Sequence, residues 1–177
     1  MTIRNLSHLL APQSIALIGA SGRDGSVGKV LTQNLVNGGF SGPIWGVNPK
    51  ASSINGIDIY RQISDLPEPP DLGVVAIPPQ HVTSAIGQLS ERGARAAVVI
   101  TAGLDQSERQ AMLSAGESVM MRIQGPNCLG LMLPPIGLNA SCSVPDDHID
   151  PRRSALFMAR SVLRNIRDGG ANACSTS

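Results

Sequence analysis

Gly19-Ala-Ser-Gly22-Arg-Asp-Gly25-Ser-Val-Gly28 is the stretch of this sequence that decides its fold. It follows the apolar run at residues 14–18 and precedes a segment of helical character at residues 29–37. A buried strand, a glycine-rich turn and a helix start together form a cradle for a phosphate group. Glycine lets the backbone approach an anion, and a helix N-terminus presents unpaired N–H groups. The alternative is a tight turn without a ligand, and the four glycines in register favour phosphate binding.

The spacing of these glycines narrows the class of ligand. A dinucleotide-binding fingerprint reads G-x-G-x-x-G, whereas here a glycine recurs at every third residue and the pattern lacks the usual second glycine. This departure indicates a phosphate-bearing ligand other than plain NAD.

The composition favours a single α/β domain. A chain of 177 residues is long enough to bury a sizeable core, and 42% of its residues are hydrophobic. Aromatic residues are scarce, with two Phe, one Trp and one Tyr, so the core must consist of Val, Ile, Leu and Ala. Such a core is typical of parallel strands covered by helices on both faces.

Several function classes are disfavoured by the same sequence. A formal net charge of +1, with no basic run, argues against binding to nucleic acid. No run reaches the roughly 18 apolar residues of a membrane span, and the first ten residues lack the apolar core of a secretory signal, so we expect a cytoplasmic protein. The cysteines and histidines are too scattered for a disulfide framework or a metal site: Cys128, Cys142 and Cys174; His8, His81 and His148. We interpret Asp146-Asp147-His148 as a solvated turn.

Strands and helices alternate along the chain. This alternation is the pattern of repeated βαβ units and predicts a Rossmann-like, doubly wound α/β domain with five or six mainly parallel strands. Right-handed crossovers would place every strand's carboxyl end at one edge of the sheet, where ligands of such sheets bind. We expect strands at residues 14–18, 43–47, 71–77, 94–100 and 121–123, a small ribbon at 57–60, and helices at 5–10, 29–37, 80–92 and 107–120.

Three further motifs should meet the glycine loop at that edge: Asn48-Pro49-Lys50, Ile77-Pro78-Pro79 and Gly125-Pro126-Asn127. An NAD-binding chain usually carries a carboxylate after its second strand, whereas this chain has Asn48 and Lys50 there. A lysine at that position favours a ligand with an additional phosphate, such as CoA or NADP, although a solvated surface lysine fits equally well. Arg23 is a second candidate phosphate partner.

The last two motifs each have two interpretations. Ile77-Pro78-Pro79 could form a rigid apolar shelf for an adenine or a pantetheine arm, or simply end a strand. Cys128 could be a nucleophile, but no histidine is close in sequence, and a small buried cysteine is the commoner case. We find no triad and no carboxylate pair, and therefore predict no catalytic residue in this chain.

A run of matching residues gives the chain a resemblance to a known family. The matches include residues 10–21, Gly25-Ser-Val-Gly28, Val47-Asn48-Pro49-Lys50, Ile77-Pro78 and Gly125-Pro126-Asn127-Cys128-Leu129-Gly130. In this order, over residues 6–145, the chain resembles the N-terminal CoA-binding domain of NDP-forming acyl-CoA synthetases, the group of the succinyl-CoA synthetase α subunit. It is equally similar to the matching domain of bacterial protein acetyltransferases that contain such a region.

The resemblance implies roles for the motifs. The glycine loop would bind the phosphorylated part of CoA, Lys50 and the end of the third strand would contribute, and Asn127 and Cys128 would border the acyl group. The parent reaction would proceed through an acyl phosphate and a phosphohistidine of a later domain, whose motif none of the three histidines matches. The candidate residues for CoA or acyl-CoA are Gly19, Ser21, Gly22, Arg23, Asp24, Gly25, Ser26, Val27, Asn48, Lys50, Ile77, Pro78, Pro79, Asn127 and Cys128.

The last part of the chain departs from this family. We expect the CoA-binding domain at residues 1–145 and a divergent or truncated tail at 146–177, with at most a short helix at 161–167. The partners expected are CoA and the remaining synthetase domains or a separate nucleotide-grasp subunit. Two alternatives stay open: an NADP-dependent oxidoreductase domain and a non-catalytic CoA-sensing module.

Overall fold

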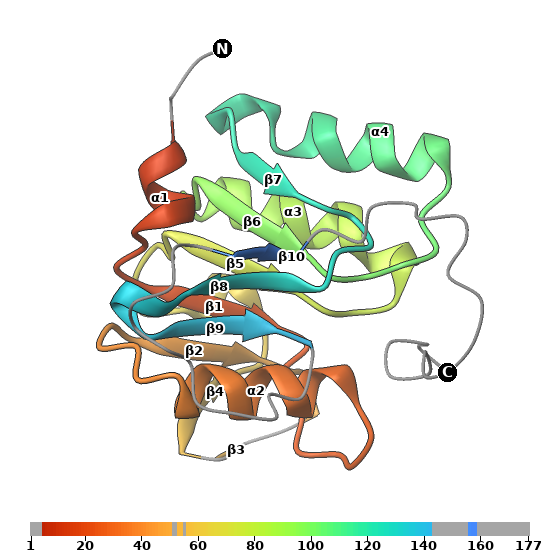
Figure 1. Ribbon diagram of the computed structural model, residues 1–177. Coiled ribbons are helices and arrows are strands. Elements are labelled where there is room, and N and C mark those ends of the chain that lie inside the picture. Colours follow the sequence, from red (N-terminus) through yellow and green to blue (C-terminus); the bar gives the residue numbers. More distant parts are fainter. Residues whose placement is uncertain (1–4, 51–52, 55, 143–155, 159–177) are drawn as a thin grey trace, which may run out of the picture.

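A seven-stranded sheet forms the centre of the computed structural model, which describes residues 5–50, 53–54, 56–142 and 156–158 (Figure 1). Its strand order is β3-β4-β2-β1-β5-β6-β7. Six strands run parallel, and short β3 pairs antiparallel with β4. The strands are β1 (Ile15–Ile18), β2 (Ile44–Val47), β3 (Ser53–Ile54), β4 (Ile57–Tyr60), β5 (Leu72–Val75), β6 (Ala96–Val99) and β7 (Arg122–Gln124).

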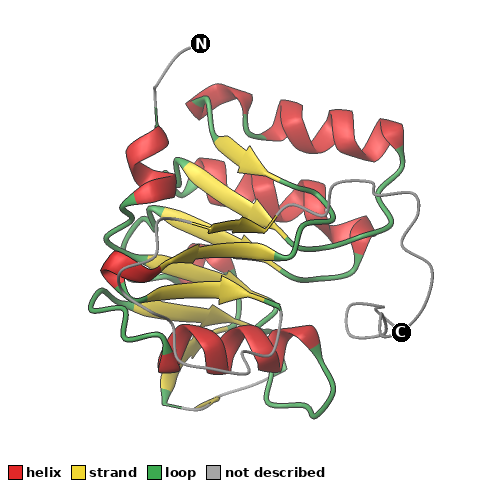
Figure 2. Cartoon of the chain, viewed as in Figure 1, coloured by secondary structure: helices red, strands yellow, loops and turns green. Residues whose placement is uncertain are grey.

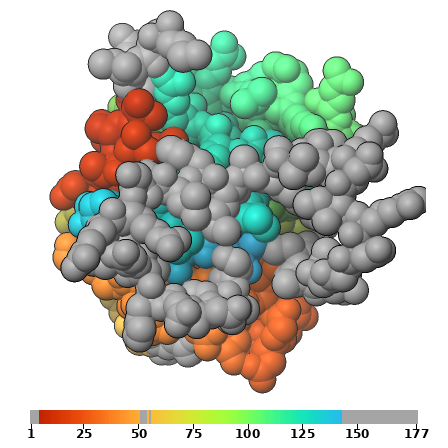
Figure 3. Space-filling model, in the orientation of Figure 1, coloured from red at the N-terminus to blue at the C-terminus, as the bar shows by residue number. Residues whose placement is uncertain are grey.

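Helices cover both faces of this sheet (Figure 2). Helix α2 (Val27–Asn37) connects β1 to β2, on one side of β1 in the sheet, whereas α3 (Val82–Glu91) and α4 (Gln106–Ala115) follow β5 and β6 on the other side. The direction of winding therefore reverses at β1, which confirms the predicted doubly wound, Rossmann-like fold. The short helix α1 (Leu6–Leu10) precedes β1. In the space-filling view, α2 and α4 lie at opposite ends of the visible face (Figure 3).

The expected elements are present, with narrower bounds in most cases. Helix α2 begins two residues earlier than predicted, because Ser26 caps it. The helix expected at 107–120 ends at Ala115, since Gly116 follows and the chain turns through a 3-10 segment, Glu117–Val119. A second 3-10 segment, Pro79–His81, precedes α3. None of the helices within the described ranges is long and apolar enough to cross a membrane.

A second, three-stranded antiparallel sheet was not predicted. Its order is β10-β8-β9, formed by β8 (Gly130–Leu133), β9 (Leu138–Ser141) and β10 (Leu156–Met158). The apolar run at 129–140 contains two prolines and two glycines, and periodicity cannot tell whether so short an apolar run is a strand or a helix. Of the tail expected at 146–177, only 156–158 are among the described residues; the helix expected at 161–167 and the turn at His148 are not.

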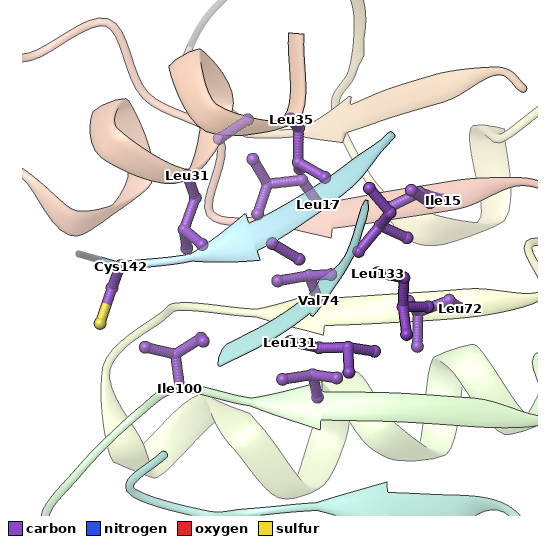
Figure 4. Close-up of a cluster of buried hydrophobic side chains, with 14 of the residues drawn as sticks. Ile15, Leu17, Leu31, Leu35, Leu72, Val74, Ile100, Leu131, Leu133 and Cys142 are labelled. Carbon is purple, nitrogen blue, oxygen red and sulfur yellow. The ribbon is translucent and has the colours of Figure 1, made fainter. Parts of the chain in front are cut away.

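Two hydrophobic clusters hold these layers together. Residues of β1 alternate between them: Ile15 and Leu17 face α2 and the small sheet, whereas Ala16 and Ile18 face α3. In the first cluster, side chains of α2 and β8 meet those of β1 and β5 (Figure 4). Fully burying one such leucine contributes about 1.5–3 kcal/mol. Figure 4 labels Ile15, Leu17, Leu31, Leu35, Leu72, Val74, Ile100, Leu131, Leu133 and Cys142 of this cluster.

The contact between α2 and the end of β1 leaves no room for side chains. A Cβ atom on Gly28 would lie 2.1 Å from the carbonyl oxygen of Gly19, and a Cβ on Gly19 would lie 2.3 Å from the carbonyl oxygen of Ala76. Gly19 also has a φ of +99°, in the region that favours glycine. These two glycines therefore set the distance between α2, β1 and β5.

We predict that Gly28→Ala destabilises the domain by about 1–3 kcal/mol, because the added methyl group must push α2 away from the loop. Gly87→Ala is the matched control, since Gly87 also lies inside a helix but its Cβ would meet nothing within 4 Å. The control should be neutral or stabilising by up to about 1 kcal/mol. Urea unfolding of both variants measures the difference, and equal stabilities would show that the contact is not tight.

Candidate functional site

The carboxyl edge of the large sheet brings the predicted motifs together. Asn48 and Lys50 follow β2, Gly19 follows β1, Ile77 follows β5, and Asn127 follows β7. Neighbouring strands are about 4.8 Å apart, so the edge from β2 to β7 is about 19 Å long. A ligand that reaches both ends of this edge must be elongated.

The glycine loop ends in a capped helix. The hydroxyl of Ser26 accepts a hydrogen bond from the Lys29 N–H at 3.2 Å and donates one to the Arg23 carbonyl at 2.7 Å. Ser26 Oγ is therefore occupied within the loop. The N–H groups of Val27 and Gly28 are left without a partner among the described residues, as expected in the first turn of a helix. With the helix dipole, these donors favour an anion at this position.

The four glycines of the loop have different roles. Gly19 and Gly28 permit the backbone contacts described above, and Gly25 adopts a φ of +73° with open space around it. Gly22 meets neither condition. A Cβ there would touch only Ile54, at an ordinary distance of 3.8 Å, and its φ lies outside the region that favours glycine. Packing against the described residues therefore does not require a glycine at position 22.

The loop carries an internal ion pair. The ammonium of Lys29 donates a hydrogen bond to the exposed carboxylate of Asp24. This hydrogen bond, together with the positive charge, holds the pKa of Asp24 below its usual value. An ionised carboxylate repels phosphate, so Asp24, one of the predicted site residues, can offer an anion only its backbone N–H. Arg23, also predicted, is exposed, and its backbone N–H donates to Ser21 Oγ at 3.1 Å.

A cleft of about 570 Å³ lies at the same edge, on the side of α3. Its apolar lining comes from β1, β2, α3 and the segment that follows β5, and polar residues of α3 also line it. No carboxylate is among the described residues that line it. The lining consists of Ile18, Gly19, Val47, Asn48, Pro49, Lys50, Arg61, Gln62, Ile63, Ala76, Ile77, Pro78, His81, Ser84, Ala85 and Gln88.

Asn48 connects the segment that follows β2 to the glycine loop. Its side-chain Nδ2 donates to the carbonyl of Ala20 at 2.7 Å, and its Oδ1 accepts from the Lys50 N–H at 2.8 Å. Its backbone N–H donates to the Tyr60 carbonyl at 2.9 Å. Asn48 therefore positions the loop and the backbone of Lys50, whose exposed side chain lines the cleft.

Only part of the motif Ile77-Pro78-Pro79 lies at the cleft. Ile77 and Pro78 line the cleft, whereas Pro79 begins the 3-10 segment and is not among the lining residues. The hydroxyl of Thr101 donates to the Ile77 carbonyl at 2.8 Å and accepts from the Ile77 N–H at 3.3 Å. Thr101 is buried and follows β6, and sequence reasoning missed it. Its two hydrogen bonds fix the backbone of Ile77 after β5.

The motif Gly125-Pro126-Asn127 is hydrogen-bonded to the same threonine. The Asn127 N–H donates to the Thr101 carbonyl at 2.9 Å, and the side chain of Asn127 is exposed. Cys128 is only 6% exposed, and its thiol donates to the Val99 carbonyl at 3.3 Å within the first hydrophobic cluster. Such a site is typical of a structural cysteine rather than a reactive thiolate.

Sequence reasoning also missed Arg61 and Gln62. Both follow the short strand β4, and both line the cleft. The available signal was the pair of polar residues directly after the ribbon predicted at 57–60. Within the described ranges, no group of three or more His, Cys, Asp or Glu side chains could hold a metal ion.

Comparison with known proteins identifies the family of this site. Residues 13–134 match the family model of the CoA binding domain. A trans-feruloyl-CoA synthase from an unidentified prokaryote is 40% identical over 133 residues, which are 72% of this chain and 19% of that protein. An ADP-forming acetate–CoA ligase of Methanocaldococcus jannaschii is 35% identical over 140 residues, covering 77% of this chain and 20% of the ligase.

A solved structure agrees with these relatives. The dinucleotide forming acetyl-coenzyme A synthetase 1 of Ca. Korarchaeum cryptofilum, in complex with phosphate and ADP, superposes with a TM-score of 0.76 at 32% identity. The match covers 80% of this chain and 31% of the synthetase chain. The chain thus spans about a fifth of the length of the two curated relatives named above. It belongs to the CoA-binding domain family, in the form found in ADP-forming acyl-CoA synthetases.

Proposed function

We propose that this domain binds CoA, or an acyl-CoA, along the carboxyl edge of its large sheet. In this proposal the diphosphate lies at the glycine loop, the adenosine end lies in the cleft beside Lys50, and the pantetheine arm passes Ile77 and Pro78 toward Asn127. The observation that carries the proposal is the edge itself, where a helix N-terminus with unpaired N–H donors lies next to a cleft that is lined by cations and by no described carboxylate.

The chemistry of the lining supports an adenosine with an additional phosphate. Ile63, Ile77 and Ala85 offer apolar contacts for a planar base, and the polar groups of Ser84 and Gln88 lie near them. A dinucleotide site for NAD would place a carboxylate after β2 to accept the ribose hydroxyl. This chain has Lys50 there, which suits a phosphate instead.

The proposed role is binding rather than catalysis. We propose that the domain serves as the nucleotide-binding part of an ADP- or NDP-forming acyl-CoA synthetase, or of a synthetase fused to an acetyltransferase. Acyl and phosphoryl transfer would then take place on other synthetase domains, while this domain holds and orients CoA. Robust thioester formation by the purified chain with ATP and an acid would contradict this division of roles.

The two alternatives make different predictions. An NADP-dependent oxidoreductase domain would bind NADP and not CoA, and the family assignment favours CoA. A CoA-sensing module would bind CoA and change its association with a partner, which size-exclusion chromatography with and without CoA would reveal.

We predict that the purified chain binds CoA saturably, binds 3′-dephospho-CoA about 10- to 100-fold more weakly, and shows no saturable binding of NADP. Loss of charge-assisted hydrogen bonds, worth about 1.5–3 kcal/mol each, accounts for the weaker binding. Isothermal titration calorimetry with the three ligands tests this. Binding of NADP alone, or of none of the three by a folded chain, would overturn the proposed function.

We further predict that Gly22→Ala weakens CoA binding about tenfold, a loss of about 1.4 kcal/mol, because the methyl group occupies space that the ligand needs. Its stability should change by less than about 0.5 kcal/mol, since the new Cβ meets no close neighbour among the residues that the structure describes. Thermal unfolding and CoA titration of the same preparation separate the two effects. Unchanged affinity would remove Gly22 from the site.

A further inference from the structure

Arg61 lies where a second cation would be needed for a ligand with two separate phosphate groups. It directly follows β4, which pairs in parallel with β2 so that Tyr60 lies beside Val47. The Asn48 N–H donates to the Tyr60 carbonyl at 2.9 Å, so the chain segments that lead to Lys50 and to Arg61 leave the sheet side by side. Both residues line the cleft.

Neither cation has a partner among the described residues. By contrast, Lys29 pairs with Asp24, and Arg109 Nε donates to the Leu104 carbonyl at 3.0 Å. For the Lys50 ammonium and the Arg61 guanidinium, the described part of the chain offers no hydrogen bond or ion pair. Two unpaired like charges in one cleft are stabilised when an anion binds between them.

No acidic side chain among the described lining residues neutralises them. Asp65 accepts a hydrogen bond from Gln62 Nε2 at 2.8 Å, and it is not among the residues that line the cleft. The cleft therefore keeps two positive charges at this end. A phosphomonoester carries a charge of about −1.5 to −2 at neutral pH, which matches two cations, and a guanidinium can donate two parallel hydrogen bonds to it.

This position is separate from the glycine loop. Strand β4 is the second neighbour of β1, so the ends of the two strands are about 10 Å apart. A single ligand that placed a diphosphate at the loop and a phosphate at Arg61 would therefore need two separate phosphate groups. CoA has both groups, whereas 3′-dephospho-CoA has only the diphosphate.

We propose that Arg61, together with Lys50, binds the 3′-phosphate of CoA and sets the preference of this domain for CoA over 3′-dephospho-CoA. The inference rests on the proposed function, because it assumes that the adenosine end of CoA lies in the cleft. It adds Arg61 as a specificity-determining residue. Arg61 follows β4 and belongs to none of the motifs identified in the sequence.

The test is a titration of Arg61→Gln and of the wild-type chain with CoA and with 3′-dephospho-CoA. We expect the variant to bind CoA about tenfold more weakly and to bind 3′-dephospho-CoA as the wild type does, so that the preference for CoA shrinks. Arg61→Lys should recover part of the lost affinity, because it keeps the charge and loses the two parallel hydrogen bonds.

Arg95→Gln is the matched control. Arg95 is also an exposed arginine, but it immediately precedes β6, at the opposite edge of the sheet. Its substitution should leave both affinities unchanged, and thermal unfolding should show that all variants are folded. An Arg61→Gln variant that binds CoA as the wild type does, or that weakens both ligands equally, would overturn the role of Arg61 alone. A folded wild-type chain that does not bind CoA would overturn the proposed function and this inference together.

Discussion

The arrangement of the whole site depends on how closely helix α2 approaches the end of strand β1. Gly28 and Gly19 bring two backbone segments so near that a Cβ on Gly28 would lie 2.1 Å from a carbonyl oxygen. Gly19 in turn lies against Ala76 at the end of β5. These contacts fix the N-terminus of α2 at the point where the winding of the sheet reverses, and ligands of doubly wound sheets bind at that point. The unpaired donors of the helix are thereby held in place before any anion binds.

A polar contact with the small sheet, which packs on the same face of the large sheet as α2, also holds this helix in place. Asn34 Nδ2 donates to the Ser141 carbonyl of β9 at 2.8 Å, and the Ser141 hydroxyl donates to Asn139 Oδ1 at 2.7 Å. All three residues are buried. A buried polar network with matched donors and acceptors specifies one arrangement, since an unpaired member would be costly. The small sheet, which sequence reasoning did not predict, therefore helps to fix the helix that carries the candidate anion site.

The sequence predicted the position of the loop better than the role of each residue in it. A strand, a spaced set of glycines and a helix are local patterns, and the fold follows from their repetition. The roles of Gly19 and Gly22 differ because Gly19 meets Ala76, more than fifty residues away, and no local pattern reveals that neighbour. The small sheet was missed for a related reason: β8 pairs with β10 as well as β9, and an isolated apolar run does not indicate its partners.

The roles of the charged residues also depend on both local and distant neighbours. Asp24 and Lys29 are five residues apart and pair within the loop, so the loop offers an anion its backbone donors rather than a free lysine. Lys50 could be singled out because it follows a clear strand. The polar pair after the predicted ribbon was a weaker signal for Arg61, because its position at the cleft depends on β4 pairing in parallel with β2, and a local pattern does not show that pairing. In the binding mode proposed above, backbone donors at the helix terminus would bind one anionic group, and the side chains of Lys50 and Arg61 would bind another about 10 Å away. In that binding mode, affinity for the diphosphate and the preference for a ligand with a second phosphate would depend on different residues, so that mutations could change each of them independently.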